Sequence, residues 1–176
     1  YGHPCNMVEI MRLAKKHKIK VIEDCSQAHG AKYKNKFVGS YGDISVWSFC
    51  NDKIISTGGE GGMIACKSKS LYNYIWSLKD IGKNKKKYYD TKKKNDYPFM
   101  HDLIGTNARI TEMQAVIGIE QLKELNKYVF IRNRNAEILY KYLSCFRFLN
   151  LPNVDNDSIH AFYRYTVSIN FNYLKK

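Results

Sequence analysis

The sequence predicts an α/β fold, with a mostly parallel sheet and helices on both faces. A helix-type pattern over residues 6–17 is followed by the β-rich run 19–23, and helix followed by strand is the repeating unit of a parallel sheet. The run 44–49 is almost continuously apolar, which is typical of a strand covered on both faces. Two long helical patterns, 111–125 and 128–143, are expected to pack against each other.

The first helix is predicted from its cap and its apolar spacing. Asn6, with Glu9 three residues later, has the spacing of a capping box, and apolar residues recur at helical intervals after it. The strand 19–23 comes next. Two short β-type runs, 31–33 and 36–38, then flank a tight turn and predict a small hairpin.

The second half of the chain is predicted to contain two further strands. Residues 63–66 follow a glycine-rich turn and are expected to form a buried strand, with a helix from about residue 68 to 78 behind it. The run 161–169 alternates strictly between apolar and polar residues and predicts one half-buried strand. A boundary near residues 145–150 divides the chain into 1–147, from a large domain and the helices after it, and 148–176, the beginning of a small α+β domain.

Length and composition indicate a globular chain. Its 176 residues, 44% of them hydrophobic, suffice for one domain-sized core, and no stretch is apolar for the roughly 20 residues of a membrane span, so no membrane association is expected and a cytoplasmic protein is the default. The chain begins at Tyr1 and stops just after a strand-like run, so we interpret it as a fragment. Five scattered cysteines lack zinc-site spacing, and no metal is expected.

Two polar residues are the first candidates for a functional site. Asp24 and Lys53 each follow a predicted buried strand, and ligands of open parallel sheets bind beyond the carboxyl ends of the strands. Each residue alone is weak support, since an aspartate that ends a strand is often a turn former and a single lysine is usually solvated.

Both residues lie in stretches that resemble a known family, the DegT/StrS-type sugar aminotransferases of the fold-type I, aspartate-aminotransferase-like transferases that depend on pyridoxal phosphate (PLP). The similar stretches are 1–4, 21–31, 48–63 and 105–122. The resemblance implies that 1–147 is the C-terminal part of the large PLP-binding domain. It also implies an enzyme that moves an amino group from an amino acid, glutamate, to a nucleotide-linked keto-sugar in amino-sugar and surface-polysaccharide biosynthesis.

The resemblance assigns a role to five residues. Lys53 matches the lysine that forms the Schiff base to PLP and then shuttles the proton, and Asp24 matches the carboxylate that pairs with the pyridine nitrogen. Gln27 matches the residue beside the cofactor ring and its phenolic oxygen, and Ser48 matches the hydroxyl that binds the phosphate. Asn107 matches a residue that reaches the phosphate of the neighbouring subunit, which implies a homodimer.

Other residues in these stretches have open roles. Arg109 is suited either to binding an anion or to a salt bridge at a helix start. His3 and His29 have equal claims to be ordinary packed residues, and we leave them outside the catalytic set. Ala108 replaces the aromatic residue usual after the asparagine. A PLP-dependent dehydratase is a rival within the family, but such members carry histidine at the Schiff-base position, where this chain has Lys53.

The net charge of +13 raises an alternative of another class. Much of the excess lies in the Lys83–Lys94 loop, so a polyanion-binding protein, or an inactive or regulatory family member, is the competing hypothesis. Nucleic acid is not the expected partner. We expect this loop either to be solvated without a role or to lie near the mouth of the cleft and attract the diphosphate of the substrate. The glycine cluster 58–62 matches neither a P-loop nor a dinucleotide fingerprint.

Overall fold

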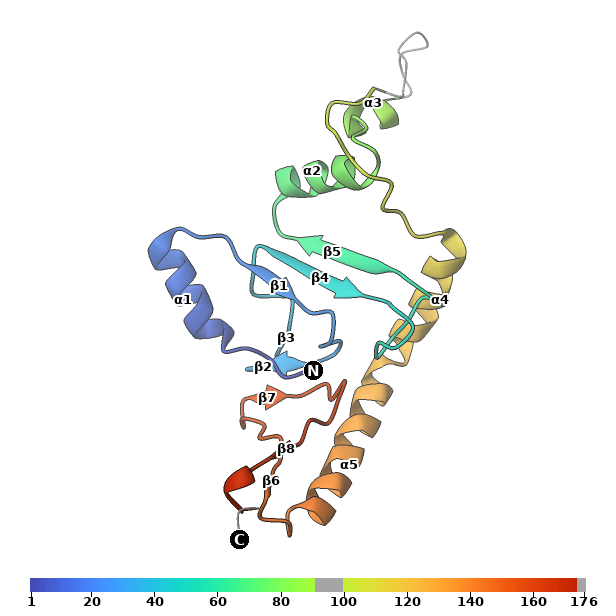
Figure 1. The fold of residues 1–176 in the computed structure, drawn as a ribbon. Coiled ribbons are helices and arrows are strands. Elements are labelled where there is room, and N and C mark those ends of the chain that lie inside the picture. The colour runs from blue at the N-terminus through green and yellow to red at the C-terminus, as the bar shows by residue number, and fades with distance from the viewer. Residues whose placement is uncertain (91–99, 174–176) are drawn as a thin grey trace.

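The computed structural model describes residues 1–90 and 100–173, and its centre is a three-stranded sheet (Figure 1). The strands β1 (Ile22–Asp24), β4 (Ile44–Ser48) and β5 (Gly62–Cys66) lie in the order β1-β4-β5. β1 and β4 are parallel, with Asp24 opposite Val46, whereas β5 runs antiparallel to β4. The predicted α/β class is confirmed. The carboxyl ends of β1 and β4 therefore meet at one edge of the sheet.

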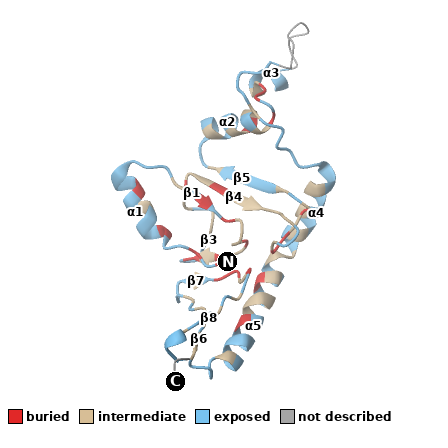
Figure 2. Ribbon diagram, viewed as in Figure 1, coloured by how far each residue is buried: buried red, intermediate tan, exposed pale blue. Residues whose placement is uncertain are grey.

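The strand β5 is exposed rather than buried, contrary to the prediction. Met63 and Ile64 are 49% and 50% exposed. The apolar run was correctly assigned to a strand, but β5 is at the edge of the described sheet and pairs only with β4. Figure 2 shows the exposed colour along most of this strand.

The helices α1 (Met7–His17) and α2 (Lys69–Lys79) begin at capping side chains. Asn6 accepts a hydrogen bond of 3.2 Å from the backbone N–H of Glu9, and Ser68 accepts one from Leu71 at the start of α2. Only half of the predicted capping box forms in α1, because the Glu9 carboxylate pairs with Arg12 at 2.9 Å. In Figure 1, α1 lies beyond β1 and α2 lies beyond β5.

The helices α4 (Glu112–Lys123) and α5 (Leu125–Leu143) form one long rod (Figure 1). The expectation that they pack against each other is wrong. Only Glu124 separates them, and its backbone angles of φ −90° and ψ −4° stay close to helical values, so the chain hardly changes direction. A complete capping box between Thr111 and Gln114 starts α4.

A second sheet connects the two ends of the chain. The predicted hairpin is present as β2 (Lys32–Tyr33) and β3 (Lys36–Phe37), and β7 (Ser158–Ile159) pairs antiparallel with β2. Lys34 and Asn35 form the turn, with φ of 44° and 62°. The short helix α3 (Lys85–Tyr89), the pair β6 (Leu149–Asn150) and β8 (Ser168–Ile169), and the 3-10 turn Phe171–Tyr173 complete the described chain.

The prediction of a single strand over residues 161–169 is wrong. Phe162 has a φ of 44°, outside the range of an extended strand, so β7 and β8 are separate. The segment between them is held by other parts of the chain, because Ala161 N–H donates to the carbonyl of Gly2 at 2.9 Å and Arg132 donates to the carbonyl of Phe162 at 3.0 Å. The domain boundary near residue 147 stays a prediction.

The main core lies between this segment and the turn that follows β4. Its buried members are Ala31, Ile54, Ala161 and Tyr163. Ile54 is next to Lys53 in sequence, so packing of this core fixes the backbone that carries the candidate lysine. Burial of these apolar side chains therefore also positions the functional site.

Candidate active site

Asp24 and Lys53 lie at the same edge of the sheet, as predicted. Asp24 is the last residue of β1, and Lys53 is in the turn after β4, where its backbone N–H donates to the carbonyl of Cys50 at 3.0 Å. The charge of Lys53 is close enough to help lower the pKa of Asp24. The parallel pairing of β1 with β4 explains this proximity, because it brings both carboxyl ends to one place.

The Asp24 carboxylate is held in its ionised form. The hydroxyl and the backbone N–H of Ser26 lower the pKa of Asp24, more than burial raises it, and Lys53 adds to the lowering. The Ser26 N–H donates to Oδ1 of Asp24 at 3.0 Å. Asp24 forms no ion pair within residues 1–90 and 100–173, so one carboxylate oxygen can accept a hydrogen bond from a cationic ligand group.

The Lys53 amine lies in a setting that the sequence did not reveal. Its side chain is 13% exposed, and Nζ lies 3.4 Å from Oδ1 of Asp52 and 5.0 Å from the ring centre of Tyr163. Tyr163 donates its hydroxyl proton to the other oxygen of Asp52. Burial alone would lower the pKa of Lys53, but Asp52 and Tyr163 raise it, so the free amine is protonated. It must lose this proton before it can bond to a carbonyl carbon.

Ser48 and Gln27 flank the same edge. The Ser48 oxygen accepts a hydrogen bond of 3.4 Å from the Cys50 N–H, which leaves the hydroxyl proton available for an anion. Gln27 is half-buried in the turn that follows β1, which closes through Ala28 N–H to the carbonyl of Cys25 at 3.0 Å. The structure thus brings four of the five predicted residues, Lys53, Asp24, Ser48 and Gln27, to one end of two neighbouring strands.

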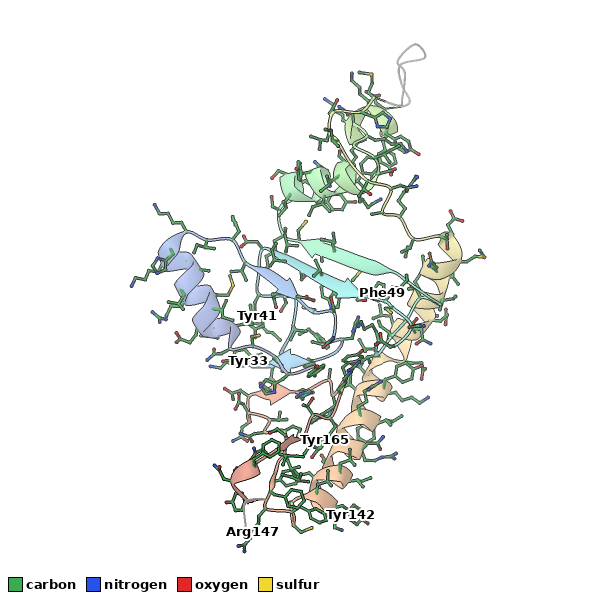
Figure 3. All side chains as sticks on the ribbon, viewed as in Figure 1. Tyr33, Tyr41, Phe49, Tyr142, Arg147 and Tyr165 are labelled. Carbon is green, nitrogen blue, oxygen red and sulfur yellow. The ribbon has the colours of Figure 1, made fainter. Side chains whose placement is uncertain are left out.

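His29 belongs to this group as well, although no sequence pattern distinguished it from an ordinary packed residue. It is 2% exposed, and its ring lies 5.9 Å from that of Phe49, which Figure 3 shows beyond the end of β4. Neither ring nitrogen has a hydrogen bond of good geometry within the described chain. Burial lowers the pKa of His29 to about 4, against a smaller opposing effect of the Ser48 backbone, and the charge of Lys53 lowers it further.

The buried, neutral His29 predicts a loss of stability in acid. The unfolded chain takes up a proton near pH 6.5, whereas the folded chain does so near pH 4, so stability is complete above pH 6.5 and falls as the pH drops toward 4. The loss is up to about 3 kcal/mol. We expect His29→Phe to reduce this loss in denaturant unfolding at pH 7 and pH 5, and His17→Phe, at the exposed end of α1, to leave it unchanged. Equal acid sensitivity of the wild type and His29→Phe would contradict the expectation.

The fifth predicted residue, Asn107, lies elsewhere. It pairs with Asp80 beyond the end of α2 and lines a groove of about 950 Å³ between β5, α2 and the segment that enters α4. Within the described residues, no hydrogen bond or ion pair joins Asn107 to Asp24, Lys53 or Ser48. Arg109, whose role was open, forms a salt bridge of 3.2 Å with Asp80 rather than with the start of α4.

The Lys83–Lys94 loop is only partly a solvated surface. Lys83 is buried, with its amine 3.3 Å from Asp80 and 4.9 Å from the ring centre of Tyr88. Lys85 lies 3.8 Å over the ring of Tyr72. The residues 91–94 at the end of this run lie outside the described part of the chain. A polyanion bound to this run could therefore not pair with Lys83, because the charge of Lys83 is already paired with Asp80 within the fold.

The chemistry of these groups fits a cofactor with an aromatic nitrogen, a carbonyl carbon and a phosphate. The ionised Asp24 suits a protonated ring nitrogen, Lys53 supplies a primary amine, and Ser48 supplies a hydroxyl donor. The buried Thr57 hydroxyl and the ring nitrogens of His29 lack partners within the described residues, and buried polar atoms of this kind are usually satisfied by a ligand or water. The donor set thus matches PLP.

A lysine amine near an ionised carboxylate, at the carboxyl edge of parallel strands, fits the PLP-transferase class of α/β proteins. A sequence model described as the DegT/DnrJ/EryC1/StrS aminotransferase family matches residues 1–176. The chain therefore belongs to this family. None of the helices in the described part of the chain combines the length and apolar character that crossing a membrane requires.

Individual relatives agree with this assignment. The chain is 38% identical to a GDP-perosamine synthase of Escherichia coli O157:H7, over 94% of this chain and 41% of the relative. An aminotransferase structure from Psychrobacter cryohalolentis is 42% identical, with a TM-score of 0.91 over 97% of this chain and 45% of the other. A GDP-4-keto-6-deoxy-D-mannose-3-dehydratase of E. coli with bound hydrated PLP is 25% identical, with a TM-score of 0.84 over 96% and 44% of the two chains. The chain spans less than half the length of each relative.

Proposed function

We propose that this chain carries the lysine-bearing part of a PLP-dependent aminotransferase that moves an amino group from glutamate to a nucleotide-linked keto-sugar. The observation that carries the proposal is the Lys53 amine, held by Asp52 and close enough to the ionised Asp24 to help lower its pKa, in a chain that matches the aminotransferase family from residue 1 to 176. The relative named GDP-perosamine synthase supports a nucleotide-sugar substrate. We extend the proposal to a role in amino-sugar and surface-polysaccharide biosynthesis. We place the enzyme in the cytoplasm.

Each predicted residue has a physical task in this proposal. PLP, when bound, supplies an electron-withdrawing ring that stabilises negative charge on the substrate carbon. Asp24 would hold the proton on the ring nitrogen, and Gln27 would lie beside the ring. Lys53 would hold the cofactor through its amine, and the amine, once released by the incoming substrate amine, would move a proton at the substrate carbon. Ser48 would donate a hydrogen bond from its hydroxyl to the phosphate.

Asp52 and Tyr163 are the additional residues that the structure supplies to this task. Asp52 keeps the Lys53 amine protonated and in place while the amine is free. Tyr163 occupies one oxygen of Asp52, so the carboxylate cannot turn fully toward the amine. Asp52 and Tyr163 thus hold Lys53 near the strand edge through the ion pair between Asp52 and Lys53.

The proposed site is completed by a second copy of the protein. Asn107 is exposed and apart from Lys53 in its own chain, which suits a residue that contributes its amide to the phosphate site of a neighbouring subunit. The functional protein is then a homodimer. A dehydratase remains the rival with the same fold, and Lys53 favours amino transfer over it, because the amine can carry the cofactor in every turnover.

Covalent mapping tests the proposal. The full-length protein is incubated with PLP, reduced with borohydride and digested, and the modified peptide is sequenced by mass spectrometry. We expect the label on Lys53, and none on Lys67, which donates instead to the carbonyl of Tyr41 at 2.8 Å. A Lys53→Arg variant serves as the matched control and should stay unlabelled. Label on another lysine, or no label in the wild type, would reject the proposed function.

A further inference from the structure

The segment that carries Asn107 is fixed to the end of α2 by its backbone. Thr106 N–H donates to the carbonyl of Leu78 at 2.8 Å, and Ala108 N–H donates to the carbonyl of Lys79 at 2.9 Å. Ile81 N–H returns a bond of 3.0 Å to the carbonyl of Thr106. Three backbone hydrogen bonds therefore surround Asn107 and define where its side chain begins.

Two glycines allow this close approach. A Cβ atom on Gly105 would lie 2.3 Å from the backbone nitrogen of Gly82, and one on Gly82 would lie 1.7 Å from the carbonyl oxygen of Leu103. Gly82 also has a φ of +79°, which favours glycine. The backbone segments 80–82 and 103–107 thus touch without intervening side chains. A charged side chain on one segment can therefore reach a side chain on the other.

The side chain of Asn107 is fixed by a chain of charged contacts that starts at Asp80. Asp80 is 6% exposed, and its Oδ1 lies 3.2 Å from Nη1 of Arg109 and 3.3 Å from Nζ of Lys83. The Nε of Arg109 then donates to Oδ1 of Asn107 at 2.9 Å. A guanidinium is planar, so anchoring Nη1 on Asp80 also sets the direction of the Nε–H bond.

This contact decides which way the Asn107 amide faces. Arginine has only donors, so the amide must present its oxygen to Arg109 and direct its NH₂ group to the other side. The NH₂ group has no hydrogen-bond partner within residues 1–90 and 100–173. Two unused donors on a rigidly held, exposed amide suit an anionic acceptor such as a phosphate.

We propose that Asp80 is a positioning residue, which acts through Arg109 to hold the Asn107 amide with its two donors directed at the cofactor phosphate of the neighbouring subunit. The inference rests on the proposed function, in which Asn107 reaches that phosphate. In this proposal Asp80 and Arg109 act only through Asn107, by the contacts of 3.2 Å and 2.9 Å that join the three residues. A purely structural role for Asp80 is the competing explanation, and it predicts effects on stability alone.

The test compares ligands with and without a phosphate. Dissociation constants of PLP and of pyridoxal, which lacks the phosphate, are measured on the full-length apoprotein. We expect Asn107→Ala to weaken PLP binding about tenfold or more, the loss typical of a charge-assisted hydrogen bond, and to leave pyridoxal binding unchanged. Arg109→Lys keeps the charge beside Asp80 but loses the directed Nε–H, and Asp80→Asn loses the anchor. Both should reproduce a selective loss for PLP of about three- to tenfold.

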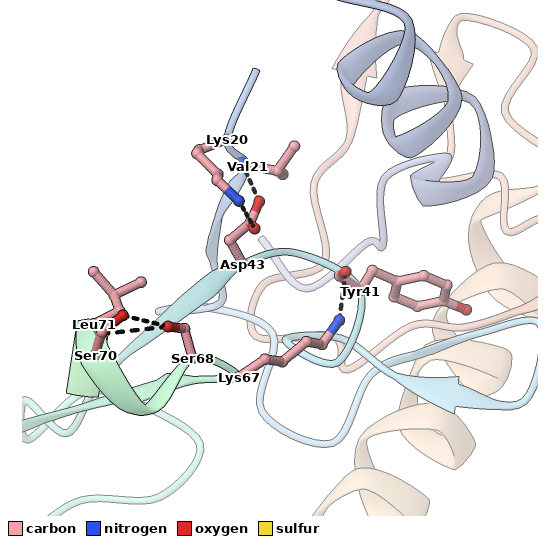
Figure 4. Close-up of polar contacts among 8 residues, drawn as sticks. All are labelled: Lys20, Val21, Tyr41, Asp43, Lys67, Ser68, Ser70 and Leu71. Atoms are coloured by element: carbon pink, nitrogen blue, oxygen red, sulfur yellow. Dashed lines mark hydrogen bonds and ion pairs between the residues drawn. The ribbon is translucent and has the colours of Figure 1, made fainter. Parts of the chain in front are cut away.

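Asp43→Asn is the matched control for Asp80→Asn. Asp43 also joins two segments, by accepting from Lys20 at 2.8 Å and from the Val21 N–H at 3.0 Å (Figure 4). Within the described residues, no hydrogen bond or ion pair joins it to Asp80, Asn107 or Arg109. It should leave the ratio of the two dissociation constants unchanged.

The outcomes separate the inference from the proposed function. If Asn107→Ala changes PLP and pyridoxal binding equally, the amide does not reach the phosphate and the inference fails, whereas labelling of Lys53 still decides the function. If Asn107→Ala is selective but Arg109→Lys is not, Asp80 has a structural role only. The Arg109 side chain is 45% exposed, so this variant gives a result even where Asp80→Asn does not fold.

Discussion

Replacing Asp24 by asparagine is expected to lower the rate of amino transfer about a thousandfold. Two unit charges 4 Å apart at an effective dielectric constant of 20 attract each other by about 4 kcal/mol before desolvation costs, which corresponds to about three pKa units on the partner. Asparagine keeps the shape of Asp24 but not the charge, so the ring nitrogen would lose its proton at neutral pH. The variant therefore separates the electronic role of Asp24 from its packing.

The measurement is kcat/KM for amino transfer at pH 7 by the full-length protein, together with the amount of PLP bound. We expect the Asp24→Asn variant to bind PLP through Lys53 and to be labelled there, yet to turn over very slowly. Asp43→Asn changes the same functional group at the start of β4 rather than at the strand end, and its rate should stay within a factor of two or three of the wild type. A rate of Asp24→Asn within tenfold of the wild type would remove Asp24 from the catalytic set.

The sequence located Asp24 and Lys53 because strand ends are local features. Both residues come after an apolar run, and parallel pairing then brings the ends together without further information. Ser48 lies inside the run 44–49, and only the family resemblance assigned it a role. The Asp52–Tyr163 contact could not be predicted in the same way. Tyr163 lies in an alternating run that resembles a strand, and only the tertiary fold shows that the run is interrupted at Phe162 and packs beside Lys53.

The same reasoning explains the errors in the helical region. The patterns of α4 and α5 show where each helix lies, but the angle between them depends on Glu124 alone, and its near-helical backbone joins them end to end. The salt bridge of Arg109 was also beyond local patterns. Its partner Asp80 is at the end of α2, and the two meet because Gly82 and Gly105 allow two distant segments to touch. Contacts of this kind depend on close packing, which a sequence pattern does not encode.

A second large effect is expected on stability, from the buried carboxylate of Glu23 in the middle of β1. Glu23 is 7% exposed, and its two oxygens accept backbone hydrogen bonds of 2.7 Å from Gly39, 2.7 Å from Tyr41 and 2.5 Å from Gly42. This carboxylate holds the loop that leads into β4. A Cβ on Gly39 would lie 2.4 Å from the Trp47 ring, so the loop is also packed closely against β4.

Glu23→Ala is expected to destabilise the full-length protein by about 3–5 kcal/mol. The substitution leaves three backbone N–H groups without an acceptor, and each unsatisfied buried donor costs about 1–3 kcal/mol, reduced where water can enter. Because β4 carries Ser48 and leads to Lys53, hydrogen exchange of the amides at 39–49 should speed up along with the loss in unfolding free energy. Asp43→Ala, whose carboxylate is partly solvated, should cost clearly less than Glu23→Ala. A loss for Glu23→Ala as small as that for Asp43→Ala would show that water replaces the Glu23 carboxylate and that the loop does not depend on it.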